Sequence, residues 1–160
     1  MKTINSWIKS ISVITFSVSA SILLFTACHK SHSDTVNNLP YTISGNADGN
    51  QVVPPVTDTG RATLTGTYNP SSRELQYTSN WIGLSGSPTS AGFYNGPAGA
   101  SGTAAGTAWS ISAGNTGTTS GKITLTQSQA DELLKGNFYY TYGTELNPGG
   151  EVRGQVSAVR

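Results

Sequence analysis

Apolar and polar residues alternate in short runs along the chain after residue 40. In residues 61–68 the even-numbered positions are apolar or small, and the odd-numbered positions are arginine or threonine. Because successive side chains of a β-strand point to opposite faces, this alternation predicts a half-buried strand. A turn at Asn69 and Pro70 ends the strand, and the same alternation returns from Leu75 to Trp81. The two runs therefore predict an antiparallel hairpin.

Further segments have a similar pattern and are bounded by clusters of glycine, proline and asparagine. They are residues 41–47, 89–95, 104–112, 120–125, 137–144 and 151–159. Strands at this spacing, without alternating helices, predict an all-β domain, an antiparallel Greek-key β-sandwich of about eight strands. Residues 96–106 are rich in glycine and alanine, which predicts an exposed loop.

One segment has a helical pattern instead. Thr126 and Gln129 have the spacing of a capping box, and Gly136 can end a helix. Between them lies an apolar stripe of Ala130, Leu133 and Leu134. Residues 126–135 therefore predict one short helix on the β-domain.

The N-terminal part of the chain has the pattern of an export signal. Lys2 and Lys9 are followed by a mostly apolar stretch over residues 11–27 that ends just before Cys28. This order resembles the signal peptide and lipobox of bacterial lipoproteins, in which a peptidase cuts before a diacylated cysteine. Phe25 departs from the leucine that is usual three places before that cysteine.

The lipoprotein resemblance divides the chain into three parts. They are a signal peptide over residues 1–27, a lipidated N-terminus and tether over 28–39, and a β-sandwich domain over 40–160. We therefore expect a lipid anchor at Cys28 that attaches the protein to a membrane of the bacterial cell envelope, facing the periplasm or the exterior. Plain secretion and an uncleaved membrane anchor are the alternatives.

Charge and cysteine content narrow the possible functions. Without Lys2 and Lys9, seven basic residues stand against eight acidic ones, which gives a net charge of −1. This balance gives no electrostatic reason to bind nucleic acid. Because Cys28 is the only cysteine, no intrachain disulfide can form.

Residues that could carry catalysis are scarce. The histidines, His29 and His32, lie in the expected tether, and neither a serine nucleophile motif nor a phosphate-binding loop occurs. Asp131 and Glu132 are neighbours on the expected helix, where such residues are typical surface charges. We therefore expect no enzymatic activity, no cofactor and no bound metal.

The C-terminal part carries the most specific motif. Residues 147–155 read Asn-Pro-Gly-Gly-Glu-Val-Arg-Gly-Gln, and shorter motifs precede it along the chain. The shorter motifs are Gly45 with residues 51–55, residues 60–64, 83–85 and 95–98, and Leu133 with Leu134. Together they resemble the chordin-type (CHRD) domain family over about residues 41–158. The resemblance implies a β-domain with a binding or scaffolding role.

The chain lacks the histidines that are common in this family. Family members commonly have His-Ile-His before Gly-Pro-Ala, where this chain has Phe93, Tyr94 and Asn95. A further family histidine falls at Gly143. A copper or zinc site of that type needs imidazole nitrogens, which phenylalanine and glycine lack. A degenerate metal-binding domain, similar to superoxide dismutase, is therefore an alternative in which the metal is lost.

Aromatic residues stand at and near these positions, and two interpretations apply to them. The first is packing in the core, which we favour because aromatic residues are good strand formers. The second is an exposed tyrosine-rich surface that binds an envelope glycan or a peptide by stacking and hydrogen bonding. Its candidate ligand-binding residues are Phe93, Tyr94, Asn95, Tyr140 and Tyr142.

The closing motif predicts a tight turn that leads into the last strand. Pro148 favours the start of such a turn, and we expect Gly149 or Gly150 to have a positive φ. In the strand that follows, parity predicts that Glu151 and Arg153 face outward together with Gln155, opposite Val152 and Val156. A pair of Arg153 with a glutamate across strands would be a structural feature before it was a binding site.

Overall fold

The computed structural model describes residues 38–160. Its strands are β1 (Tyr41–Asp48), β2 (Arg61–Asn69), β3 (Glu74–Ile82), β4 (Pro88–Asn95), β5 (Thr103–Ala105), β6 (Gly117–Thr124), β7 (Phe138–Thr144), β8 (Val152–Gln155) and β9 (Ser157–Val159). Its helices are the 3₁₀ helix η1 (Gly49–Gln51) and α1 (Gln127–Leu134). The expected signal peptide, the anchor Cys28 and most of the expected tether lie outside the described residues. No helix within residues 38–160 is long and apolar enough to cross a membrane.

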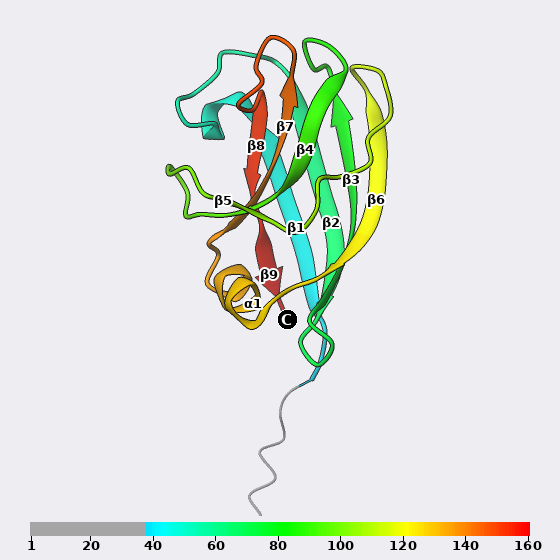
Figure 1. Cartoon of the computed structure of the whole chain (residues 1–160), viewed down its shortest axis with the longest axis vertical. Coiled ribbons are helices and arrows are strands. Elements are labelled where there is room, and N and C mark those ends of the chain that lie inside the picture. Colours follow the sequence, from blue (N-terminus) through cyan, green and yellow to red (C-terminus); the bar gives the residue numbers. More distant parts are fainter. Residues whose placement is uncertain (1–37) are drawn as a thin grey trace, which may run out of the picture. The chain divides into compact units, whose positions relative to one another are not determined.

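The strands form one antiparallel sheet in the order β5-β4-β7-β8-β1-β2-β3-β6, with β9 paired to β1 (Figure 1). The sheet curls, so that the ring of Tyr77 in β3 lies 5.0 Å from that of Phe93 in β4. Trp81 in β3 likewise lies 5.2 Å from Tyr142 in β7. The two halves of the sheet therefore face each other across the core, as the layers of a sandwich do. The predicted all-β antiparallel fold is confirmed, with its two layers joined in one sheet.

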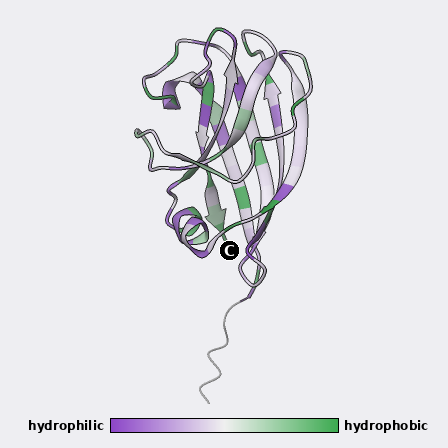
Figure 2. Ribbon diagram, viewed as in Figure 1, coloured by the Kyte–Doolittle hydropathy of each residue, from purple (hydrophilic) through white to green (hydrophobic). Residues whose placement is uncertain are grey.

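The β2–β3 hairpin is confirmed together with its alternation. Leu64, Tyr68, Leu75 and Trp81 are buried, whereas the threonines of β2 and Gln76, Thr78 and Asn80 of β3 are exposed. Hydrophobic and hydrophilic positions alternate along the strands in Figure 2. The core is thus built from one parity of each strand, as the sequence pattern predicted.

The segment after β5 differs from the prediction. We predicted a strand over residues 104–112, but β5 ends at Ala105 and the chain turns at Gly106, where φ is +85°. Trp109 is buried beyond that turn, and its ring stacks on the ring of Tyr77 at 4.6 Å. The chain leaves the sheet because this large indole fills the space between the two halves.

The last strand is also divided. β8 pairs with β7 and, through Arg153 and Asp48, with β1, and β9 pairs with β1 through Ser157 and Ser44. Between them the N–H of Val156 donates to the carbonyl of Phe138 at 2.8 Å. The segment predicted as one strand over residues 151–159 is therefore interrupted at Val156, and both of its parts pair with β1.

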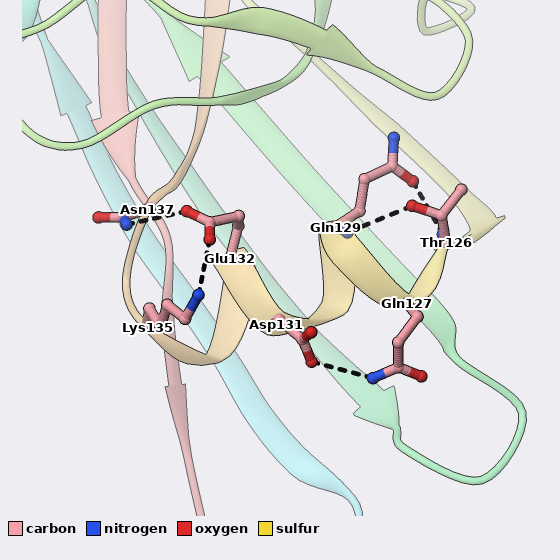
Figure 3. Close-up of polar contacts among 7 residues, drawn as sticks. All are labelled: Thr126, Gln127, Gln129, Asp131, Glu132, Lys135 and Asn137. Atoms are coloured by element: carbon pink, nitrogen blue, oxygen red, sulfur yellow. Dashed lines mark hydrogen bonds and ion pairs between the residues drawn. The ribbon is translucent and has the colours of Figure 1, made fainter.

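Helix α1 begins as the sequence predicts. The Gln129 N–H donates to Thr126 Oγ1 at 3.2 Å, and the Thr126 N–H donates to Gln129 Oε1 at 2.9 Å (Figure 3). At the other end Glu132 accepts hydrogen bonds from Lys135 and Asn137, each at 2.9 Å. These hydrogen bonds hold the pKa of Glu132 below its usual value. They also connect the end of the helix to the start of β7.

Candidate functional site

The aromatic candidates divide between the core and the surface. Phe93, Tyr140 and Tyr142 are 2%, 0% and 0% exposed, because they point from β4 and β7 toward the other half of the sheet. Core packing, the favoured interpretation, describes these residues, and they are not available to an exposed tyrosine surface. Tyr94 and Asn95, at the end of β4, remain partly exposed.

The buried tyrosines have internal hydrogen-bond partners. The Tyr140 hydroxyl lies 2.9 Å from the Ala62 carbonyl and 3.2 Å from the Gly45 carbonyl, and it donates toward them. The Tyr142 hydroxyl donates to Ser79 Oγ at 2.8 Å. Burial raises the pKa of Tyr140 and of Tyr142 well above the ordinary tyrosine value, because a phenolate would lose its hydration there.

Because the pKa values of Tyr140 and Tyr142 are raised, we expect the stability of the folded domain to fall at alkaline pH. The unfolded chain loses tyrosine protons above about pH 10, whereas folded Tyr140 and Tyr142 keep theirs. Their contribution to stability is therefore fully present below the unfolded pKa and is lost as pH rises above it. Ultraviolet titration should show fewer tyrosines ionising near pH 10 in the folded chain than in urea. Equal titration of all tyrosines in both states would contradict the burial of these hydroxyls.

A stack of side chains lies on the outward face of β4, β7 and β8. The rings of Tyr94 and Tyr139 are 5.3 Å apart and nearly parallel, with an angle of 14°. On the other side of Tyr139, the Arg153 guanidinium carbon lies 3.7 Å from the ring centroid. A guanidinium over a tyrosine face is attracted to the negative face of the ring. The stack therefore fixes the position of Arg153 relative to β7.

Arg153 is buried although it faces outward, which corrects the predicted exposure. The loop that follows β4 covers it: Nη2 donates to the Pro97 carbonyl and Nη1 to the Ala100 carbonyl, both at 2.8 Å. Arg153 is 4% exposed and forms no ion pair with a glutamate within residues 38–160. Parity identified the face correctly but does not reveal that a distant loop covers it. Burial lowers the pKa of Arg153, which nevertheless stays protonated.

Gln155 connects three further segments to β8 near Arg153. Its Nε2 donates to the Gly96 carbonyl at 2.9 Å and to the Gly136 carbonyl at 2.7 Å. Its backbone N–H donates to Gln51 Oε1 at 3.2 Å. Asp48 caps η1 by accepting from the Gln51 N–H at 3.2 Å, and this holds the segment that contains Gln51 beside β8.

Between these segments lies a cavity of about 360 Å³, which we call the Arg153 pocket. Three parts of the chain line it: Asn50 and Gln51 of η1 with Val52, Val53 and Pro55 after it, Ala98 and Gly99 of the loop after β4, and Arg153 and Gln155 of β8. No acidic side chain is among its lining residues. The pocket thus combines apolar walls with amide groups and one guanidinium, a composition typical of small-ligand sites.

Glu151 lies on the neighbouring turn and is 0% exposed, which also corrects the predicted outward position. Its Oε1 accepts from the Ser85 N–H at 2.7 Å, and its Oε2 accepts from Thr144 Oγ1 at 2.6 Å and from the Ser85 hydroxyl. These donors satisfy the carboxylate without a basic partner. Glu151 therefore joins the Gly-Leu-Ser segment to the closing motif, which is a structural role.

The residues present do not fit the metal site that the family histidines imply. Phe93 lies in the core, and Gly143 has no space for a side chain. A Cβ added at Gly143 would lie 2.5 Å from Ser90 Oγ and 2.9 Å from the Pro148 carbonyl oxygen. Among residues 38–160, no group of three histidine, cysteine, aspartate or glutamate side chains could hold a metal ion.

Strand parity alone does not identify the Arg153 pocket. Gln51, Ala98 and Arg153 are far apart in the sequence, and each appears there only as one position of a short motif. The sequence does contain one signal for the pocket. The motifs at residues 51–55, 95–98 and 147–155 all belong to the same family resemblance, and the fold brings residues from these three motifs to one cavity.

Comparison with protein families confirms the resemblance to the CHRD domain that the motifs indicated. The family model of the CHRD domain matches residues 43–156, from within β1 to just beyond β8. This match covers well over half of the chain and includes every segment that lines the Arg153 pocket. No curated protein and no solved structure matches the chain.

Proposed function

This chain belongs to the CHRD domain family, and from that premise we propose that it is a non-catalytic cell-envelope lipoprotein that binds a ligand in the Arg153 pocket. The family suggests a binding or scaffolding domain. The observation that carries the proposal is the convergence of three family motifs on one cavity, where a buried guanidinium has only neutral acceptors.

A binding role is also supported over catalysis by the chemistry of the domain. Residues 38–160 contain no histidine or cysteine, and the pocket contains no carboxylate that could act as a base. The near-zero net charge gives no electrostatic reason to bind nucleic acid. The partners we propose are a membrane, through the lipid anchor, and an envelope protein or glycan.

Site-specific photo-crosslinking tests the pocket in bacterial cells that produce the full chain. A photoreactive amino acid at Val53, a pocket wall residue that is 39% exposed, should crosslink to an envelope component. Thr57 is exposed in the same segment but does not line the pocket, so the same group there should give no such product. Ala98→Trp should suppress the Val53 product by filling the cavity. Equal products from both positions would contradict a ligand site at the pocket.

The proposed lipid anchor predicts the behaviour of Cys28→Ser. Lipidation requires the cysteine thiol, so the variant should lose incorporation of a radiolabelled fatty acid and should be released or remain as uncut precursor. Ser33→Ala, in the expected tether, is the matched control and should be labelled as the unchanged chain is. Equal labelling of Cys28→Ser and the unchanged chain would refute the lipoprotein assignment.

A further inference from the structure

The Arg153 pocket contains a cation that the described domain does not neutralise. The ion pairs within residues 38–160 are Lys122 with Glu74 and Lys135 with Glu132, and Arg153 belongs to neither. Carbonyl oxygens compensate part of the cost of burying its charge, but a carbonyl carries no negative charge. Asp48, the cross-strand neighbour of Arg153, accepts hydrogen bonds from Asn50 and Gln51 and forms no ion pair with it, so within the described residues Arg153 has no charged partner. The pocket can therefore accommodate an anionic group at Arg153.

Hydrogen-bond donors beside this cation are also available. The Arg153 contacts use Nη1 and Nη2, so its Nε–H has no acceptor within the described residues. Asn50, Val53 and Gly99 also line the pocket and are exposed. An anion in the pocket would thus lie beside the Arg153 guanidinium and these exposed residues. Charge-assisted hydrogen bonds of this kind are the stronger ones in proteins.

The remaining walls are apolar. Val52, Val53, Pro55 and Ala98 line the cavity together with the polar residues, and Val53 and Ala98 are exposed at its surface. A volume of about 360 Å³ lies at the lower end of ligand pockets, which suits an end group better than a continuous chain segment. A small inorganic anion would leave these apolar walls without a contact.

We propose that the Arg153 pocket binds the C-terminal residue of an envelope protein, with the carboxylate at Arg153 and an apolar side chain against Val52, Val53 and Pro55. This inference rests on the proposed function and names the class of ligand. A C-terminal carboxylate is planar and matches the planar guanidinium, and the attached apolar side chain occupies the rest of the cavity. Capture of a chain terminus by clustered donors is a known mode of peptide recognition.

Calorimetric titration of the full chain with matched peptides tests the proposal. The probes are acetyl-Gly-Ser-Leu as the free acid, the same peptide with a C-terminal amide, and octanoate. The free acid should bind at least tenfold more tightly than the amide, because only the acid carries the negative charge. It should also bind more tightly than octanoate, which has the carboxylate and the apolar group but no peptide bond. Binding of the acid should weaken as salt is added.

Charge variants connect binding to the pocket without removing Arg153, whose loss could loosen the loop. Ala98→Glu places a carboxylate at the pocket and should weaken binding of the free acid at least tenfold, whereas Ala98→Gln should weaken it much less. Ser101→Glu, exposed in the same loop but not lining the pocket, is the matched control and should bind as the unchanged chain does. Urea midpoints of the three variants should agree.

Several results would overturn the proposal. They are equal affinity for acid and amide, tighter binding of octanoate than of the acid, undiminished binding by Ala98→Glu, and no binding of the acid at millimolar concentration. Crosslinking at Val53 in cells does not depend on which terminus the ligand presents. If the Val53 product persisted, the pocket would still be a ligand site, and only the assignment of its ligand as a C-terminal carboxylate would be wrong.

Discussion

Replacing Glu151 with alanine is expected to lower the free energy of unfolding by about 4 kcal/mol. The carboxylate is fully buried and accepts hydrogen bonds from the Ser85 N–H, the Ser85 hydroxyl and the Thr144 hydroxyl. The substitution removes the buried carboxylate acceptor of the Ser85 N–H and of the Thr144 hydroxyl. It also removes the connection between the Gly-Leu-Ser segment and the closing motif, so the effect should reach the whole domain.

Urea denaturation of the full chain measures this effect, with Glu145→Ala as the matched control. Glu145 is exposed on the neighbouring turn and has no ion pair within residues 38–160, so its removal should change stability by no more than about 0.5 kcal/mol. Glu151→Gln should be intermediate, because its amide oxygen still accepts the Ser85 N–H. Equal midpoints for Glu151→Ala and Glu145→Ala would show that the buried carboxylate is dispensable.

Gly150→Val is expected to destabilise the domain by about 3 kcal/mol. Gly150 has φ of +131°, a conformation that side chains with a Cβ rarely adopt. An added Cβ would also lie 2.7 Å from Thr141 Oγ1, which donates to the Val152 carbonyl at 2.8 Å. Valine at this position therefore strains the turn and displaces a contact that holds β8 against β7.

Gly149 provides the control within the same turn. It is exposed, its φ is not in the positive range, and nothing lies within 4 Å of an added Cβ. Gly149→Val should therefore unfold at nearly the urea concentration of the unchanged chain. The sequence predicted a positive φ at one of these two glycines, and the structure assigns it to Gly150. A wild-type midpoint for Gly150→Val would mean that the turn relaxes without cost.

The parts of the fold that the sequence predicted well depend on local patterns. The alternation in β2 and β3 decides which side chains are buried, and Asn69 and Pro70 mark the turn between them. The capping box of α1 likewise involves only Thr126 and Gln129, three residues apart. Such features need no information about the rest of the chain.

The errors share a different cause, which is contact between distant segments. Trp109 follows a strand-like pattern but leaves the sheet because Tyr77 and the opposite half provide a place to bury its ring. Arg153 faces outward as parity predicts, yet it is covered by a loop more than fifty residues earlier in the chain. Neither contact is visible in a local window of sequence.

The sequence predicted the motifs that form the candidate site, but it did not predict that these motifs meet in space. The motifs that contain Gln51, Ala98 and Arg153 were recognised from the sequence, but their meeting at one cavity depends on the order of strands in the sheet. The burial of Tyr140 and Tyr142 agrees with core packing, the interpretation favoured over an exposed tyrosine surface. Parity correctly placed Tyr140 and Tyr142 on one face, but it does not decide which face of a strand is the inner one.

Hydrogen-exchange mass spectrometry on the full chain, with and without a solubilised envelope extract, tests most directly whether the domain is a binding module that uses the Arg153 pocket. Binding there predicts slower exchange in residues 50–55 and 96–100 when the extract is present, and loss of that protection in Ala98→Trp. Exchange in the hairpin of β2 and β3 should not change. Unchanged exchange in both pocket segments, or protection that persists in Ala98→Trp, would contradict the proposed site.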